Sequence, residues 1–195
     1  MPWTFFNSNG EAMIIVGGVP NPLNANLDIS TLLLVGNGGS TGIAISAAGE
    51  VTMAAQPAVL AHNSAQDSNV TGNGTAYTLD LDTEIFDQNA DFASDTFTAP
   101  ITGRYLISAN CKMYGNTTAA TYANINLNCS NRTLNNQTHH NGDNNTSLSV
   151  QGSFIVDMDA DDTCGIIVTF SGESSDVVDV SGSGVETQIS VCLLA

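Results

Sequence analysis

From residue 57 onward the chain consists of short segments in which apolar and polar residues alternate, separated by turns rich in Gly, Asn, Asp and Ser. A period of two places one face of a segment in a core and the other in solvent, which is typical of a β-strand. Residues 103–114, 147–159 and 163–170 are three of at least eight such segments. Their near-regular spacing, without a helical pattern, predicts an all-β fold: an antiparallel sandwich of the jelly-roll type.

The first 56 residues have a different composition. They are rich in Gly and Asn, and they carry only short apolar pieces between glycine turns. About 50 residues of such short strands cannot bury a core of their own. We therefore expect two parts, residues 1–56 and 57–195. The first is expected to be a short β-rich stalk or attachment segment that is stabilised by copies of itself or by a larger surface.

The charge balance excludes two classes of partner. The chain has 195 residues and only three cations against 19 acids, so its net charge is -16, while 11% of its residues are charged at all. Three cations cannot neutralise a nucleic-acid backbone or an anionic membrane surface. The longest apolar run, residues 32–35, is far below the roughly 20 residues that cross a bilayer. We therefore expect no nucleic-acid partner and no membrane insertion.

Four cysteines, Cys111, Cys129, Cys164 and Cys192, lie far apart in apolar or alternating stretches, with no C-x-x-C pair. Residues 1–10 have neither the positive nor the apolar region of a secretion signal, so we expect folding in a reducing cytoplasm. Four buried free thiols are the expected state. One or two disulfides remain an alternative, whereas the spacing of structural zinc ligands is missing.

Several ordered motifs resemble the complement-1q-like globular domain, a trimeric jelly roll related to tumour necrosis factor. The most specific is Phe97-Thr-Ala-Pro-Ile-Thr-Gly-Arg-Tyr105, a Phe followed by Pro-x-x-Gly-x-Tyr and an apolar strand. The other matching stretches are residues 57–62, 84–87, 153–168 and 188–194. The resemblance covers about 140 residues and implies a homotrimer. A collagen-like Gly-x-y repeat does not occur in the sequence.

The low charge and the Asn- and Thr-rich turns resemble the versions of this domain found on bacteriophage and other viral fibres. Residues 1–10 also resemble the N-termini of phage structural proteins that dock onto a virion. The resemblance implies a non-enzymatic virion protein of the fibre, spike or tail-fibre type, assembled in the host cytoplasm. Its partners would be itself, other virion structural proteins, and a host cell-surface glycan or protein. A capsid decoration protein without receptor binding and a secreted lectin of the same fold are the alternatives.

Residues 135–145 form the longest stretch without apolar alternation, so we expect a loop whose sequence the core does not dictate. Amide and imidazole side chains can hydrogen-bond a polar ligand. The candidate receptor contacts are therefore Asn135, Asn136, Gln137, His139, His140 and Asn141. A solvated loop without a ligand is the alternative.

Three aromatic rings, Trp3, Phe5 and Phe6, lie within the first six residues. Exposed rings at a chain terminus favour burial against another surface, so these residues are the candidates for attachment to the virion.

Calcium is the one cofactor that the sequence suggests. Asp157, Asp159 and Asp161 place carboxylates at alternate positions, as a hard cation prefers, but the complete pattern of a calcium loop is missing. An acidic turn between two apolar strands explains these residues equally well. No nucleophile elbow of the G-x-S-x-G type occurs, and we select no catalytic residue.

Overall fold

The computed structural model describes residues 4–6, 12–14, 34–35, 41–45, 48–140 and 146–195. The chain divides into two compact units, Met1–Thr52 and Met53–Ala195, and we call the second unit the head. The sequence placed this boundary four residues later. In the described ranges all regular structure is β-strand, and no helix there could span a membrane. The expected all-β jelly-roll architecture with a β-rich N-terminal segment is confirmed.

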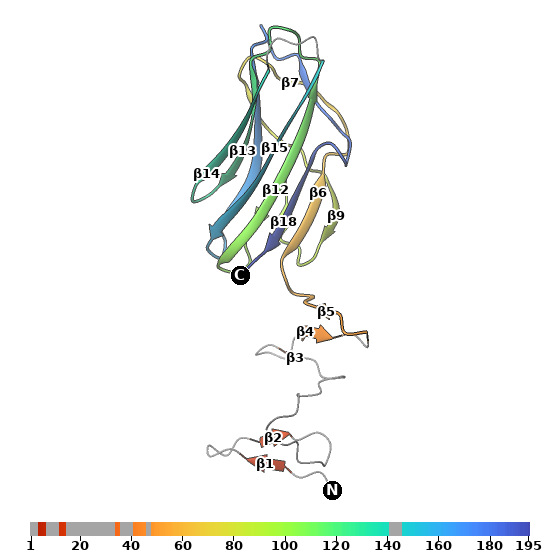
Figure 1. Cartoon of the computed structure of the whole chain (residues 1–195), viewed down its shortest axis with the longest axis vertical. Helices are drawn as coiled ribbons and strands as arrows, with labels where there is room; N and C mark the ends of the chain where they lie inside the picture. Colours follow the sequence, from red (N-terminus) through yellow and green to blue (C-terminus); the bar gives the residue numbers. More distant parts are fainter. Residues whose placement is uncertain (1–3, 7–11, 15–33, 36–40, 46–47, 141–145) are drawn as a thin grey trace. The chain divides into compact units, whose positions relative to one another are not determined.

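The N-terminal unit contains two small antiparallel sheets (Figure 1). One pairs β1 (Thr4–Phe6) with β2 (Ala12–Ile14). The other places β4 (Thr41–Ile45) between β3 (Leu34–Val35) and β5 (Val51–Thr52). These strands are two to five residues long, as expected for a segment rich in glycine turns.

One layer of the head is a seven-stranded sheet in which β12 (Gly103–Tyr114) is the central strand (Figure 1). β15 (Ser147–Met158) pairs with β12 along its whole length. The opposite edge of β12 carries β18 (Gln188–Leu193) and, further along, β17 (Val178–Val180). The remaining strands are β6 (Ala58–His62) and β9 (Thr83–Asp87) beyond β18, and β7 (Asp67–Thr71) beyond β17.

The other layer is a six-stranded sheet around β16 (Thr163–Ser171). β13 (Tyr122–Cys129) pairs with one edge of β16, and β14 (Thr133–His139) follows β13 as the edge strand. The other edge of β16 carries two short strands, β8 (Ala76–Thr78) and β11 (Thr96–Thr98), and β10 (Phe92–Ala93) pairs with β11.

The core lies between the two sheets and explains the Phe–Pro–Gly–Tyr motif. Phe97 and Tyr105 are fully buried, and their rings meet edge to face with centroids 5.3 Å apart. The hydroxyl of Tyr105 donates a hydrogen bond to the carbonyl of Ile101, 2.7 Å away. The motif therefore ties the turn before β12 to the centre of the core.

The expected loop at residues 135–145 is wrong in its first half. Residues 135–139 belong to strand β14, which pairs in continuous antiparallel register with β13. β14 is an edge strand with mostly exposed side chains, so its backbone pairing does not require the alternation that marks a buried strand. Residues 141–145 lie outside the described residues.

The expectation of four free thiols is also wrong. Cys129 on β13 and Cys164 on β16 stand opposite each other, with Cα atoms 4.0 Å apart, and form a disulfide. Cys111 is a free buried thiol, and desolvation raises its pKa to about 12. Cys192, on β18, is free and half-buried. The pairing depends on the register of strands that are separated in sequence by β14 and β15, and composition does not report that register.

Candidate functional site

The six candidate receptor contacts do not form one cluster. Asn135, Gln137 and His139 alternate along β14 and face outward from the six-stranded sheet. Asn136 points the other way and donates a hydrogen bond from Nδ2 to the carbonyl of Gln151 on β15. The backbone N–H of His140 donates to the carbonyl of Thr121, and the His140 ring contacts Asn116. Asn141 lies outside the described residues.

The three outward candidates belong to a larger polar surface. Inward residues of β13 are buried, so its even-numbered residues share the outward face with the odd-numbered residues of β14 and β16. We call this surface the amide face. Its members opposite one another across the three strands are Tyr122, Asn124, Asn126, Asn128, Thr133, Asn135, Gln137, His139, Gly165, Ile167, Thr169 and Ser171. The three strands contain no Asp, Glu, Lys or Arg.

Cross-strand pairs order most of the amide face. Thr133 donates a hydrogen bond from Oγ1 to Asn128 Oδ1 over 3.0 Å, and Asn135 donates from Nδ2 to Asn126 Oδ1. At the other end of the strands, Tyr122 and His139 meet edge to face with centroids 6.4 Å apart. These contacts hold the side chains of neighbouring strands in register.

One row of the amide face is not satisfied by the protein itself. Asn124 stands opposite Gln137 on β14 and opposite Thr169 on β16. Within the part of the chain that the structure describes, none of these three side chains makes a hydrogen bond, and Asn124 Oδ1 is buried without a partner. Asn124 Oδ1 is closed to solvent, so the unused hydrogen-bonding capacity that a ligand can reach in this row belongs to the side chains of Gln137 and Thr169.

The opposite surface of the head, on the seven-stranded sheet, has a different chemistry. Ile155 on β15 is 63% exposed, and Phe86 on β9 is 48% exposed. The register places smaller apolar side chains between them across β12, β18 and β6. We call this surface the apolar face; it comprises Ala58, Leu60, Phe86, Leu106, Ile155 and Cys192. Beside it Ser108, Ser153 and Ser190 line a depression of about 350 Å³.

The strands that form the apolar face contain few of the acidic residues of the chain. Of the 19 acids in the chain, three (Glu84, Asp87 and Asp157) lie in β6, β9, β12, β15 and β18, and β12 carries the two cations Arg104 and Lys112. Three acids and two cations nearly cancel, so in a chain of net charge -16 these strands can meet their copies without strong like-charge repulsion.

Glu186 lies at the end of the seven-stranded sheet, where its carboxylate contacts the end of β12. Lys112 Nζ donates to Glu186 Oε1 over 2.6 Å, and the hydroxyls of Tyr114 and Ser181 each donate to Oε2 over 2.7 Å. These hydrogen bonds, the one from Lys112 first, lower the pKa of Glu186 to about 2. Lys112 Nζ also lies 4.9 Å from the centroid of the Tyr114 ring. The carboxylate therefore fixes the segment before β18 to β12.

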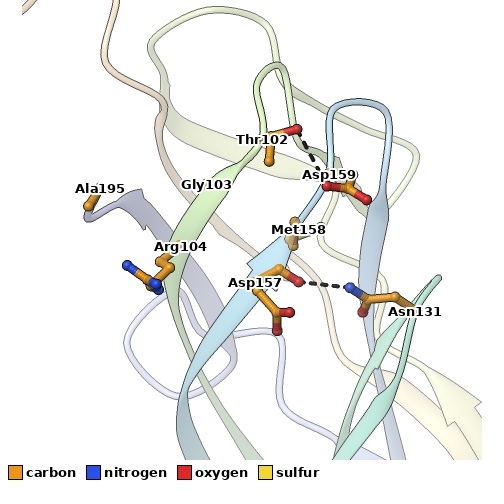
Figure 2. A pocket seen from close by; sticks show the side chains of 8 residues that line it. All are labelled: Thr102, Gly103, Arg104, Asn131, Asp157, Met158, Asp159 and Ala195. Carbon is orange, nitrogen blue, oxygen red and sulfur yellow. Dashed lines mark hydrogen bonds between the residues drawn. The ribbon is translucent and has the colours of Figure 1, made fainter.

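The candidate calcium ligands do not converge. Asp157 forms an ion pair with Arg132. Figure 2 shows the 3.5 Å hydrogen bond that Asp159 accepts from Thr102. Asp161 lies in the turn between β15 and β16 with a φ of 71°. In the described ranges no three His, Cys, Asp or Glu side chains are placed to hold a metal ion. Asp157, Asp159 and Asp161 are therefore not gathered around one point in the described part of the single chain.

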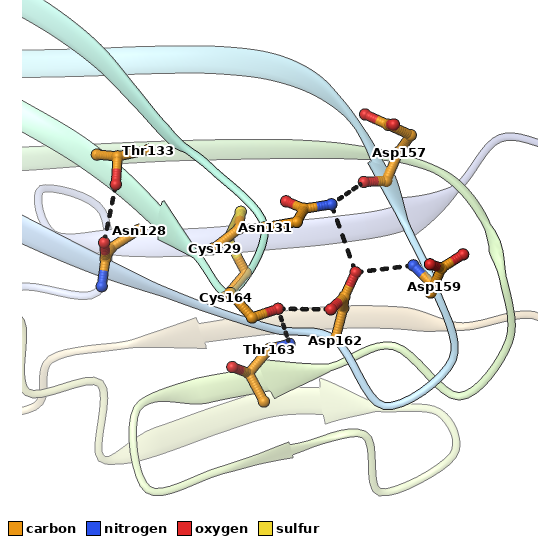
Figure 3. Close-up of a disulfide and its surroundings, with 10 residues drawn as sticks. Asn128, Cys129, Asn131, Thr133, Asp157, Asp159, Asp162, Thr163 and Cys164 are labelled. Carbon is orange, nitrogen blue, oxygen red and sulfur yellow. Dashed lines mark hydrogen bonds between the residues drawn. A yellow bond between two sulfur atoms is a disulfide. The ribbon is translucent and has the colours of Figure 1, made fainter.

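The acidic turn is ordered instead by Asp162, a residue that the sequence did not single out (Figure 3). Its carboxylate accepts hydrogen bonds from the Ser130 hydroxyl, 2.6 Å, and from the backbone N–H of Asp159, 2.9 Å. The bond from Ser130 is the first cause that lowers the pKa of Asp162. The turn between β15 and β16 is thereby joined to the turn after β13, next to the disulfide.

The candidates for virion attachment stay predictions. Trp3 lies outside the described residues. Phe5 and Phe6 belong to β1, whose backbone alone is described.

The comparisons with known proteins concern the fold of the head. No family model and no curated protein matches the sequence. Among solved structures, murine APRIL at pH 8.5 is similar with a TM-score of 0.50 and 10% identity, covering 71% of this chain and 99% of that one. The globular domain of zebrafish complement 1qA matches with a TM-score of 0.48 and 13% identity over 71% of this chain and 98% of that one. The similarity to APRIL supports the jelly-roll fold expected from the motifs.

Proposed function

We propose that this chain is a homotrimeric structural protein of a virion, of the fibre, spike or tail-fibre type, and that its head contacts a host-cell surface. The N-terminal unit attaches the chain to other structural proteins of the particle. The head binds and does not catalyse. Three heads in one fibre, and many fibres on one particle, turn a weak contact into durable attachment.

The apolar face is the observation that carries the proposal. Large apolar side chains that are 48% and 63% exposed, as Phe86 and Ile155 are, are typical of a surface that another surface covers. A second copy of the chain is the partner that suits it, because the strands of the apolar face carry so little of the net charge of -16. The motifs that resemble the trimeric complement-1q-like domain favour three copies rather than two.

The disulfide favours a final location outside a reducing compartment. A released virion meets this condition, and so does a secreted lectin of the same fold. The secreted lectin therefore remains the second candidate function.

Particles that lack the chain test the proposal. We expect them to assemble but to adsorb poorly to host cells, and we expect the purified chain to compete with intact particles for adsorption. Normal adsorption of the deletion particles would identify a capsid decoration protein instead. Recovery of the chain only in the medium, never on particles, would identify the secreted lectin.

A further inference from the structure

The proposed function leaves open which surface of the head meets the host and what chemistry it recognises. We propose that the amide face binds a neutral polysaccharide. The centre of the contact is the cross-strand row formed by Thr169 on β16, Asn124 on β13 and Gln137 on β14. The inference rests on the proposed role of the head in surface attachment, and it assigns the ligand class and the face.

The hydrogen-bonding capacity of the amide face matches a sugar. Sugar hydroxyls donate and accept hydrogen bonds, as do the amides of Asn and Gln and the hydroxyl of Thr. In the described residues the side chains of Asn124, Gln137 and Thr169 have no hydrogen-bond partner, while the rows of Asn126 and Asn128 are paired across the strands. The protein thus holds the flanking side chains in place and leaves Gln137 and Thr169 of the central row available for a ligand, while Asn124 Oδ1 between them is buried.

An aromatic edge lies directly beside this row. Tyr122 and His139 are the next outward pair along β13 and β14, and their rings contact each other. A ring at the end of a polar row supplies the apolar contact that the C–H face of a sugar needs, while the amides orient its hydroxyls.

The length of the amide face suits a chain of sugars. From Tyr122 to Asn128 the outward residues of β13 extend over about 20 Å, at roughly 3.3 Å per residue. This length accommodates several successive rings. An extended polymer could therefore contact the central row and the paired rows together.

Charge distinguishes neutral from anionic polysaccharides. The three strands of the amide face carry no cation to attract a sulfate, phosphate or carboxylate, and the whole chain has a net charge of -16. An anionic polymer would be repelled by this field. A neutral polymer is not repelled by this field.

A protein partner fits the amide face less well. Protein interfaces depend on a few buried aromatic or aliphatic anchors. Among the described residues, the large apolar side chains with the highest exposure lie elsewhere, and none is on β13, β14 or β16. The aromatic and aliphatic side chains of the face, Tyr122, His139 and the half-buried Ile167, are outnumbered by its amides and hydroxyls, which suit a sugar better than a protein partner.

Affinity electrophoresis of the full chain in gels that contain dextran, mannan, galactan or a β-glucan tests the proposal. We expect at least one of these neutral polymers to retard the wild-type chain. Polygalacturonate, an anionic polymer, should not retard it. Two variants remove the central row without touching the core: Gln137→Ala shortens an exposed edge residue, and Thr169→Val replaces a hydroxyl by a methyl group of similar shape.

Each variant should weaken retardation about threefold to tenfold, the range expected for one or two lost hydrogen bonds. Gln66→Ala, which shortens an exposed amide that bonds Asp179 away from the amide face, is the matched control and should bind as the wild type does. Binding that is equal in all variants, binding of polygalacturonate alone, or no retardation by any neutral polymer would overturn the inference.

The same samples separate this inference from the proposed function. Their oligomeric state is measured in parallel, together with competition for adsorption. A trimer that competes with particles but ignores every neutral polymer would refute the assigned ligand and leave the function standing. A chain that is monomeric and does not compete would refute the function itself.

Discussion

At the residue scale, Tyr105 shows how one side chain connects a turn to the core. Its ring is fully buried against Phe97, and its hydroxyl donates to the carbonyl of Ile101 over 2.7 Å. Burial raises the pKa of Tyr105, so the hydroxyl remains protonated and able to donate.

Replacing Tyr105 by Phe keeps the ring and removes this donor. We expect Tyr105→Phe to lower the free energy of unfolding by about 1 kcal/mol, the usual value of one such hydrogen bond. Urea denaturation followed by fluorescence measures the change. Tyr122→Phe is the matched control, because no hydrogen bond to the Tyr122 hydroxyl occurs among the described residues, and it should leave the unfolding midpoint unchanged. Equal effects of the two substitutions would contradict this role of Tyr105.

Glu186 makes the stability of the head depend on pH. Its pKa is about 2 in the folded chain against an ordinary value of 4.5, because Lys112, Ser181 and Tyr114 hydrogen-bond the carboxylate. A lowered folded pKa means that the stabilisation is complete above pH 4.5 and is lost as the pH falls toward 2.

Glu186→Gln should therefore flatten the decline of unfolding free energy between pH 4.5 and 2. Thermal denaturation across this interval, at one fixed chain concentration, measures the slope. Glu84→Gln changes the same residue type on β9 and should retain the wild-type slope. If both variants keep that slope, the hydrogen bonds to Glu186 do not contribute in solution.

At the element scale, the disulfide joins two neighbouring strands of the six-stranded sheet, β13 and β16. It links residues that are 35 positions apart. Closing a loop of this length stabilises a fold by about 4 kcal/mol in the chain-entropy description. The bond thus secures the pairing of the two central strands that carry the amide face.

Alkylation of the unfolded chain without reductant should label two cysteines, Cys111 and Cys192, and alkylation after reduction should label all four. Reduction should also lower the free energy of unfolding by about 4 kcal/mol. Mass spectrometry counts the labels. Four labels without reductant would show that the chain carries free thiols, as the sequence alone suggested.

The strands also show what sequence patterns can and cannot predict. Alternation identified β12, β15 and β16, because each has one face in the core. The same test misassigned residues 135–139, because an edge strand such as β14 need not alternate. The disulfide was missed because it depends on the register of β13 against β16.

The amide face was partly visible in the sequence. Asn124, Asn126 and Asn128 alternate with buried residues on β13, and this pattern of amides at every second position marks a polar sheet face. Of the amides on this face, only Asn135 and Gln137 of β14 were expected as receptor contacts. The second half of the face required the pairing of β13 with β14, which local residue patterns do not specify.

At the scale of the whole molecule, the two outer surfaces of the head differ in chemistry. The apolar face exposes Ile155 and Phe86, while the amide face exposes uncharged hydrogen-bonding groups. In the proposed trimer, copies of the head meet through the apolar face. The amide faces then point away from the three-fold axis, where a ligand can reach them.

Sedimentation velocity of the full chain at micromolar concentration tests self-association through the apolar face most directly. If three copies associate through the apolar face, the chain sediments as a species of three times the monomer mass. Ile155→Asp places a charge on a side chain that is 63% exposed in the single chain, so it should fold but sediment as a monomer. Asn128→Asp adds the same charge to the amide face and should remain a trimer. A monomeric wild-type chain, or an Ile155→Asp variant that remains trimeric, would contradict the account.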